Sequence, residues 1–236
     1  MSNFFDAVVQ SVNDPGVVGK RQEAVVIAGR YTIAPATMSE APRNEIIPLW
    51  PTWIGKLQLP DAGEKNRALF DLAGQRSADA NLFEVDQPAV GWLRDWISAA
   101  VGQWFEKMKV QPAPQYRLTG RLEALGFGQY RELANEPGAY LAGLYFVNTP
   151  DAPELDHLRG DCFASHISLL DPRVGFDALT LDGDPSYPPE IMAGPAAGIL
   201  MLWPGYLRCC SRVHLARVPW VRVALRIELD GKAAAQ

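Results

Sequence analysis

Residues 220–229 read WVRVALRIEL, and every second residue from Val221 onward is aliphatic. Successive side chains of a β-strand point to opposite faces, so this alternation predicts a strand with one wholly apolar face. The other face would carry Trp220, Arg222, Ala224, Arg226 and Glu228. If the strand lines a barrel, the two arginines on its inner face would form an anion site. A solvated polar face is the alternative interpretation of the same pattern.

Short strand-like runs, separated by Pro, Gly and Asp, follow one another from about Tyr116 onward. The runs that we expect to form strands are Tyr116–Leu125, Gln129–Leu133, Ala139–Val147, Ser165–Leu170, Ala178–Leu181, Gly198–Trp203 and Trp220–Leu229. Many short strands with turn residues between them predict a β-sandwich or a β-barrel.

Two helices are expected upstream of these strands. The first spans about residues 62–74. The second opens near Asp86, a suitable N-cap, has Pro88 in its first turn and runs to about residue 108. Its apolar residues follow helical spacing and are Val90, Leu93, Ile97, Val101, Trp104 and Met108. This stripe predicts a helix packed on a sheet, against the apolar face of residues 220–229.

The first part of the chain has a less regular pattern. Residues 1–45 are expected to form an N-terminal extension, with a short helix ending near Val12 and a strand at Glu23–Ala28. Residues 46–236 would then form a single domain. Its helices would lie within residues 62–108 and its β core over about residues 112–230.

Composition and charge narrow the classes of function. Of the 236 residues, 48% are apolar and 21% charged, and the formal net charge is −5. Nucleic-acid backbones are bound by clustered Lys and Arg, so this balance predicts no nucleic-acid partner. We also expect no membrane span and no signal peptide, because no long apolar stretch occurs. Three cysteines, two of them adjacent, do not suggest a disulfide framework, so we expect a cytoplasmic protein.

Five segments, in chain order, are similar to the motifs of a known family. They are Ile47–Thr52, Gly128–Tyr130 with the following Pro137–Val147, Leu170–Arg173, Ala197–Leu207 and Arg222–Leu225. Together they resemble a bacterial family of 2-oxoglutarate/iron(II)-dependent oxygenases over about residues 46–230. The resemblance implies a mainly β fold with flanking helices, namely the double-stranded β-helix, which is a jelly-roll or cupin-like barrel.

The same resemblance implies a metal and a cosubstrate. In that family iron(II) sits inside the barrel on two imidazoles and a third ligand, and 2-oxoglutarate binds beside it. An arginine on a late strand pairs with the distal carboxylate of the cosubstrate. Arg222 matches this arginine, and Arg226 lies further along the same face. Iron(II) and 2-oxoglutarate are thus the expected cofactors if the family chemistry survives, with Arg222 and Arg226 as cofactor-binding residues.

The positions of the iron ligands carry other residues. Ala134 and Glu136 stand where the family has His-x-His, and Cys209 stands at the distal histidine. Alanine cannot coordinate a metal, so the standard motif provides no iron site. A site rebuilt from Glu136, His166 and His214, with Cys209 as a thiolate ligand, is the alternative. We expect positions 134, 136 and 209 to lie close together at the mouth of the barrel.

These patterns lead to three hypotheses about function. The first is an oxygenase-like pseudoenzyme without the standard iron site, a non-catalytic or accessory protein that binds a small anion or a protein partner and could form a homodimer. The second is an active non-heme iron oxygenase with relocated ligands. The third is an interaction module whose lumen is filled with apolar side chains. If the pocket is closed, Arg222 should be locked to an internal carboxylate, with Glu123, Glu136 and Glu228 as candidates.

Overall fold

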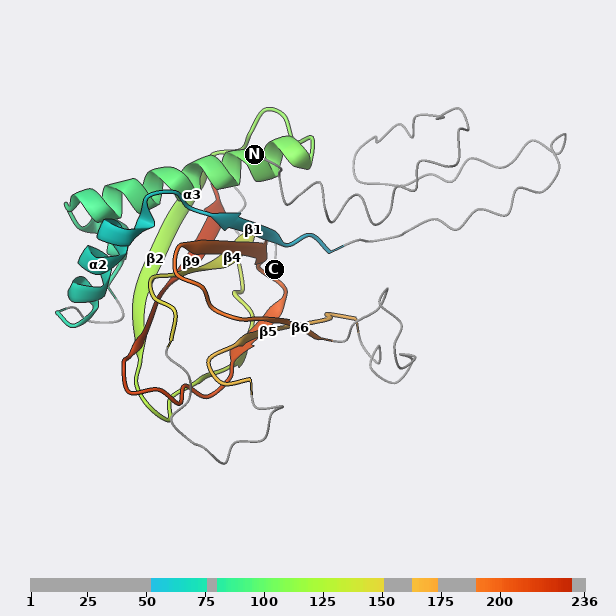
Figure 1. The fold of residues 1–236 in the computed structure, drawn as a ribbon. Helices are drawn as coiled ribbons and strands as arrows, with labels where there is room; N and C mark the ends of the chain where they lie inside the picture. The colour runs from blue at the N-terminus through green and yellow to red at the C-terminus, as the bar shows by residue number, and fades with distance from the viewer. Residues whose placement is uncertain (1–51, 76–79, 151–162, 174–189, 231–236) are drawn as a thin grey trace, which may run out of the picture. The chain divides into compact units, whose positions relative to one another are not determined.

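The computed structural model of the protein describes residues 52–75, 80–150, 163–173 and 190–230. In chain order the elements are β1 (Gly55–Gln58), α2 (Ala62–Ala73), the short 3₁₀ helix η1 (Leu82–Glu84), α3 (Pro88–Lys107), β2 (Tyr116–Leu125), β3 (Arg131–Ala134), β4 (Leu141–Phe146), β5 (Ile167–Leu170), β6 (Glu190–Ala193), β7 (Ile199–Pro204), β8 (Arg208–Ser211) and β9 (Trp220–Leu229). Figure 1 shows their arrangement.

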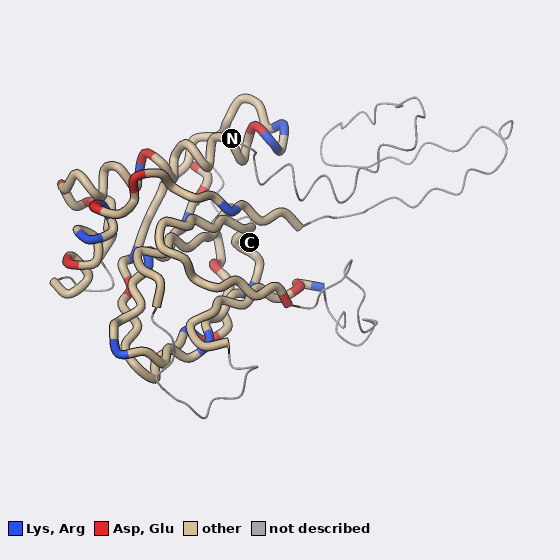
Figure 2. Tube along the Cα trace, in the orientation of Figure 1, with Lys and Arg blue, Asp and Glu red and all other residues tan. Residues whose placement is uncertain are grey.

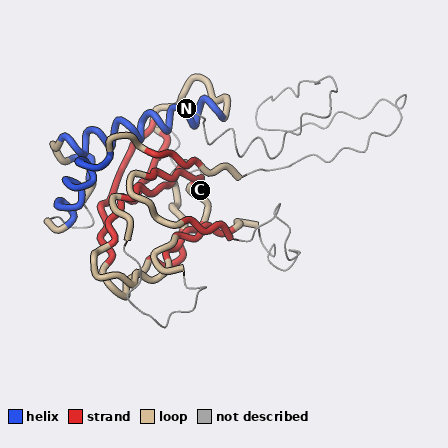
Figure 3. The backbone as a smooth tube through the Cα atoms, viewed as in Figure 1, coloured by secondary structure: helices blue, strands red, loops and turns tan. Residues whose placement is uncertain are grey.

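The strands form two antiparallel sheets. One sheet has five strands in the order β1-β7-β4-β9-β2, and the other has four in the order β3-β8-β5-β6. The helices, blue in Figure 3, lie to one side of the strands. Within the described residues α2 and α3 are the only α-helices, so the fold is mainly β with flanking helices, as the sequence predicts.

Helix α3 packs on the outer face of the five-stranded sheet, together with α2 (Figure 1). The apolar stripe of α3 and the apolar face of β9 belong to one buried cluster, which includes Val90, Leu93, Ile97, Val101, Trp104, Val221, Val223, Leu225 and Ile227. This contact confirms the packing predicted from the two periodicities. Burial of each such aliphatic side chain contributes roughly 1.5–3 kcal/mol, so the interface is a major source of stability.

The opposite face of the five-stranded sheet turns toward the four-stranded sheet. A second apolar cluster fills much of the space between the sheets, with Ala142, Leu144, Phe146, Ile167, Leu169, Met201, Trp203 and Trp220 among its members. Strand β4 is buried along its whole length because it contributes to both clusters. The even-numbered residues of the first part of β9 therefore face the interior of the barrel.

A glycine allows two central strands to approach closely. A Cβ atom on Gly143, in β4, would lie 2.5 Å from the carbonyl oxygen of Met201 in β7. A contact this short with backbone cannot be relieved by a side-chain rotation. The close pairing of β4 and β7, which forms one wall of the barrel, thus depends on the missing side chain.

Most predicted elements match the observed ones within a few residues. The helix expected at 62–74 is α2 and the one expected near 87–108 is α3, although its N-cap is Gln87 and not Asp86. The structure adds three strands that the sequence did not predict, β1, β6 and β8. The predicted N-terminal helix and strand and the predicted strand Ala178–Leu181 lie outside the described residues.

Acidic and basic residues are interspersed along the described chain (Figure 2). None of the helices that the structure describes is both long and apolar enough to cross a membrane.

Candidate functional site

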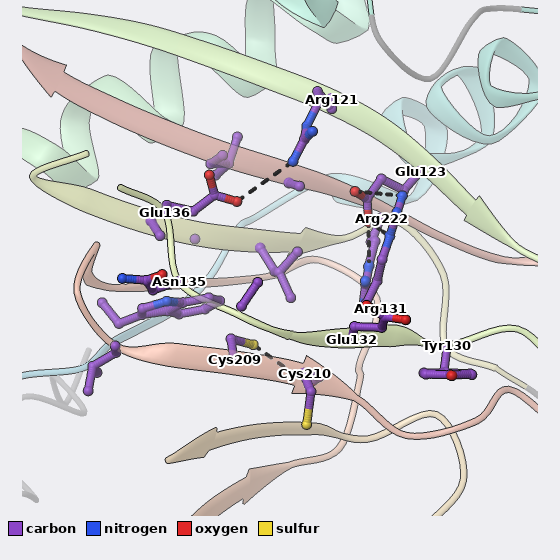
Figure 4. A pocket seen from close by; sticks show the side chains of 18 residues that line it. Arg121, Glu123, Tyr130, Arg131, Glu132, Asn135, Glu136, Cys209, Cys210 and Arg222 are labelled. Carbon is purple, nitrogen blue, oxygen red and sulfur yellow. Dashed lines mark hydrogen bonds and ion pairs between the residues drawn. The ribbon is translucent and has the colours of Figure 1, made fainter. Parts of the chain in front are cut away.

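A cavity of about 470 Å³ opens between the two sheets. Its walls come from β2, β4, β7 and β9 of the larger sheet and from β3 and β8 of the smaller sheet. The residues that directly follow β3 and β7 complete the lining (Figure 4). A second cavity of about 230 Å³ shares four of its lining residues, Arg121, Glu136, Ala224 and Leu225. The barrel interior is therefore not filled with apolar side chains, which makes the lumen expected for a pure interaction module wrong.

The charged centre of the cavity is an ion pair between neighbouring strands. Glu123 of β2 lies directly opposite Arg222 of β9 in the antiparallel register. Arg222 Nε donates a hydrogen bond to Glu123 Oε2 at 3.0 Å, and the side chains are only 3% and 5% exposed. Arg222 thus points inward and is locked to an internal carboxylate, as expected for the closed arrangement, although a cavity remains beside it.

Burial and packing set the electrostatics of Arg222. Loss of solvent lowers the pKa of this guanidinium, and the neighbouring carboxylate of Glu123 acts in the opposite direction. One face of the guanidinium lies over the ring of Trp220, with the carbon Cζ 4.7 Å from the ring centroid. Arg222 Nη1 is buried and has no hydrogen-bond partner within the described residues. One donor of a buried cation therefore remains unsatisfied in a residue that lines the cavity.

A second arginine shares the carboxylate of Glu123. Arg131 Nη2 lies 2.9 Å from Glu123 Oε1, and Arg131 is 50% exposed, so it approaches from the solvent side. Its backbone is held on β3 because the amide of Arg131 donates to Ser211 Oγ at 2.7 Å. The group Arg131–Glu123–Arg222, which we call the triad, contains two positive charges and one negative charge. Its net charge is thus +1.

Glu136 lies between two further arginines at the border of the two cavities. Its carboxylate contacts Arg226 Nη1 at 3.0 Å and Arg121 Nη2 at 3.7 Å. Arg226 also contacts Glu228 at 2.8 Å, and Arg117 pairs with the same Glu228. Arg117 is the main cause of the lowered pKa of Glu228, with Arg226 as a lesser one. All these side chains are at least partly exposed, so solvent screens the network.

The turn that carries Glu136 has a fixed geometry. The amide of Glu136 donates to the carbonyl of Gly205, and the carbonyl of Glu136 accepts from the amide of Ala139. Gly138 within this turn has a φ of +81°, which favours glycine. A Cβ atom on Gly205 would lie 2.2 Å from the carbonyl oxygen of Ala139. These contacts hold the turn against the end of β7 and direct Glu136 toward its arginines.

The three positions that the resemblance assigns to iron ligands lie together, as expected. Ala134 of β3 and Cys209 of β8 are register partners, and both line the large cavity with Glu136. These residues do not fit iron(II). Ala134 offers no donor atom, and the carboxylate of Glu136 is already engaged by two arginines. Burial raises the pKa of the Cys209 thiol to about 12, and a sulfur donor is not among the imidazole and carboxylate ligands of such an iron(II) site.

The structure does not bring the alternative metal ligands together. Neither His166 nor His214 lines the cavity that contains Glu136 and Cys209. His214 is fully buried, with Nδ1 2.9 Å from Ser165 Oγ and Nε2 2.8 Å from the carbonyl of Val218, so both ring nitrogens are engaged.

His166 Nδ1 contacts the carbonyl of Ala164 at 2.9 Å. His157 lies outside the described residues. Within the described residues, no three His, Cys, Asp or Glu side chains are placed to hold a metal ion. The rebuilt site from Glu136, His166, His214 and Cys209 is therefore not assembled.

The two arginines of β9 occupy different surroundings. Arg222 is buried in the large cavity, whereas Arg226 is 32% exposed and lines the smaller one.

The sequence did not predict the role of Arg131, because the approach of Arg131 to Glu123 depends on how β3 pairs with β8. It also missed the clamping of Glu136 by Arg121. The alternation of Arg121 and Glu123 along β2 was the available signal, since it places both side chains on the face that Arg222 shares.

Comparison with known proteins identifies the class of fold. No protein-family model matches this sequence, and no curated protein is significantly similar to it. Among solved structures, AviO1 from Streptomyces viridochromogenes Tue57 is 13% identical with a TM-score of 0.51, and the match covers 78% of this chain and 92% of that one. Apo HygX from Streptomyces hygroscopicus is 12% identical with a TM-score of 0.50, covering 76% and 83%. A prolyl-4-hydroxylase from Pseudomonas putida is 11% identical with a TM-score of 0.49, covering 75% and 88%.

HygX has also been solved with nickel and 2-oxoglutarate bound. With two facing antiparallel sheets and helices on the larger one, the chain has a double-stranded β-helix fold like that of AviO1 and apo HygX. At these identities the likeness shows the fold alone, and the function has to be argued from the site.

Proposed function

We propose that this chain is a non-catalytic binding protein that holds a small anion inside an oxygenase-type barrel and has lost the iron chemistry of that fold. Two properties of the cavity support the proposal. One is the set of residues at the former ligand positions. The other is the buried cation Arg222, whose donor atom Nη1 has no acceptor among the described residues.

The ligand positions oppose redox turnover. In an iron(II) oxygenase site two imidazoles and a third protein ligand bind the iron, and the remaining coordination positions of the iron stay open. Here Ala134 has no donor, Cys209 offers sulfur in place of an imidazole, and Glu136 is held between Arg226 and Arg121. Arg222, which by resemblance would pair with the distal carboxylate of 2-oxoglutarate, already pairs with Glu123.

The buried cation of Arg222, which lines the cavity, carries the proposal for anion binding. Buried polar groups in folded proteins are almost always hydrogen-bonded, and an unsatisfied donor on a charged group is costly. Arg222 Nη1 is buried without a partner among the described residues, and Arg222 lines a cavity of about 470 Å³. This volume is in the range of small-molecule sites. An anion in the cavity would lie beside this buried cation and complement its positive charge.

The test combines metal binding with turnover. Purified protein is incubated with iron(II) and 2-oxoglutarate without oxygen, separated from free metal and measured by elemental emission; succinate is assayed after oxygen is admitted. We expect no stoichiometric iron and no succinate. A double variant, Ala134→His with Cys209→His, offers two imidazoles beside Glu136 and is the matched comparison, in which iron binding should rise. A stoichiometric iron site with succinate formation in the unaltered protein would overturn the proposal.

A further inference from the structure

The arginines around the large cavity differ in how many of their donors are open to a ligand. We propose that Arg121 makes the direct contact with the anion, at the junction of the two cavities. The anion then presents two oxygens side by side, as a carboxylate or a phosphate monoester does. This inference rests on the proposed function, because it assumes an anion in the cavity and names the residue that holds it.

Two of the three arginines that line the large cavity already use their donors on Glu123. Arg222 donates from Nε to Glu123, and its side chain is only 3% exposed, so it acts on a ligand mainly through its charge. Arg131 directs both Nε, at 3.3 Å, and Nη2, at 2.9 Å, to the same carboxylate. An anion could use this guanidinium only by breaking its contacts with Glu123. Arg121 is the third arginine of the lining.

The guanidinium of Arg121 is accessible and has no close partner. Among the residues that the structure describes, it makes no hydrogen bond, and its ion pair with Glu136 spans 3.7 Å from Nη2 to Oε1. This distance is beyond the range of a hydrogen bond. Arg121 extends from β2 toward Glu136 (Figure 4), and its side chain is 47% exposed. Its planar fork of N–H groups can therefore bind two oxygens of one anion.

An anion can bind Arg121 without leaving Glu136 unpaired. Glu136 accepts a hydrogen bond from Arg226 Nη1 at 3.0 Å, which is the shorter of its two ion pairs. This contact remains when Arg121 turns to a ligand. Arg121 would exchange a loose contact of 3.7 Å for charge-assisted hydrogen bonds of about 2.7–2.9 Å. The exchange adds hydrogen bonds and removes none.

The position of Arg121 places the anionic group at the junction of the two cavities. Arg121 lines both the cavity of about 470 Å³ and the one of about 230 Å³. Its register partner on β9 is Ala224, which also lines both and whose small side chain leaves the junction open. The larger cavity has apolar side chains in its wall, among them Leu144, Trp203 and Leu207. It therefore offers room for the body of an organic anion.

Three probes with the same six-carbon body test the class of ligand. Hexanoate presents a carboxylate, hexyl phosphate presents a phosphate monoester, and hexanamide has one carbonyl oxygen and no charge. Each is titrated into the full-length protein by isothermal calorimetry at the same pH and ionic strength. We expect saturable binding of an anionic probe, and the tighter of the two identifies the anionic group. Hexanamide should bind more weakly than this probe by about tenfold or more.

Two arginine variants test the residue. Arg121→Gln and Arg131→Gln each remove one positive charge from the wall of the same cavity, and the two side chains are 47% and 50% exposed. The affinity of the tighter anionic probe should fall by about tenfold or more in Arg121→Gln, because direct hydrogen bonds are lost. In Arg131→Gln it should fall by less than about threefold, because only a screened charge is lost. Thermal unfolding checks that both variants are folded.

A carboxylate variant tests the competition for Arg121. Glu136→Gln removes the carboxylate beside Arg121, while Arg226 keeps its contact with Glu228 at 2.8 Å. Affinity for the anionic probe should rise by about threefold or more, and the gain should disappear when Arg121→Gln is added. Glu132→Gln is the matched control, because Glu132 also lines the large cavity and is exposed. Its effect should be smaller than that of Glu136→Gln.

The outcomes separate this inference from the proposed function. If Arg121→Gln binds the anionic probe as tightly as the unaltered protein, or if Arg131→Gln loses as much affinity, Arg121 is not the contact residue, while the anion site stands. If hexanamide binds as tightly as the better anionic probe, the class of ligand is wrong. If none of the three probes binds to the folded protein and 2-oxoglutarate also fails to bind, the anion site itself fails, and the proposed function with it.

Discussion

Removal of the Glu123 carboxylate should destabilise the fold more than removal of any exposed charged side chain. In Glu123→Ala both arginines of the triad, Arg131 and Arg222, lose their partner. Arg131 is 50% exposed and can turn to water, but Arg222 is 3% exposed and cannot. Removing one partner of a buried ion pair typically costs 3–5 kcal/mol, and the adjoining cavity lets water approach the guanidinium. We therefore expect a loss near the lower end, about 3 kcal/mol.

Urea unfolding at neutral pH, analysed by linear extrapolation, measures the change. Glu190→Ala is the matched control, because Glu190 is 33% exposed and pairs with Arg212, which is 48% exposed. That pair should contribute no more than about 1 kcal/mol. A double variant, Glu123→Leu with Arg222→Met, should recover most of the stability, since replacing both buried charges by apolar groups is often nearly neutral.

A Glu123→Ala variant that loses no more stability than Glu190→Ala would contradict the burial of the Arg222–Glu123 pair. Such a result would mean that Arg222 is hydrated and that the pair does not behave as a buried one. A double variant less stable than Glu123→Ala alone would also contradict it, because the cost would then come from lost packing rather than from an unpaired charge.

Three further changes probe other parts of the fold. His214→Phe leaves the polar partners of both ring nitrogens unsatisfied and should lower the free energy of unfolding by about 2–4 kcal/mol in urea titrations; a neutral result would contradict the buried contacts. Gly143→Ala places a Cβ 2.5 Å from the Met201 carbonyl oxygen and should reduce Tm, whereas Gly63→Ala, in helix α2 with open space around it, should raise Tm slightly. In a variant whose other cysteines are serine, Cys209 should resist thiol reagents until the protein unfolds. Its folded pKa of about 12 exceeds the ordinary value of 9.0, so its contribution to stability is complete below pH 9 and declines toward pH 12.

The elements that sequence predicts best are those with a long, unbroken period. Ten alternating residues define β9, and the three- and four-residue spacing of the apolar positions defines α3. Both patterns exist because each element buries one complete face, and the two faces meet in one cluster. A regular pattern of this length leaves little choice of structure or of orientation.

The strands that sequence reasoning missed are short and lack such a pattern. Strand β6 has its two central residues exposed, and β8 is Arg-Cys-Cys-Ser, whose side chains carry no alternation of polarity. Among the described strands, β1 lies at the edge of its sheet and pairs with β7 alone. A four-residue strand that lies at a sheet edge or has no wholly buried face shows no regular alternation of apolar and polar residues. Such a strand can be recognised only from the strands with which it pairs.

The site was predictable in part. Alternation along β9 places Arg222 inward, and the need of a buried charge for a partner leads to a short set of glutamates. The choice of Glu123 from that set depends on the register between β2 and β9, which residue spacing alone does not fix. Arg131 depends on a bulged pairing of β3 with β8, formed by segments some 80 residues apart. Contacts of this kind arise only from the folded topology.

The presence of an arginine at position 222 is no sign that a cosubstrate binds there. A guanidinium buried in a barrel needs one negative charge nearby, and either a ligand or the chain can supply it. In this chain Glu123 supplies it from the neighbouring strand, so the fold is complete without 2-oxoglutarate. The exposed Arg131 then restores one positive charge to the group, and Nη1 of Arg222 remains without an acceptor among the described residues. An internal carboxylate on a neighbouring strand can thus serve as the counter-ion of a buried barrel arginine in place of a ligand.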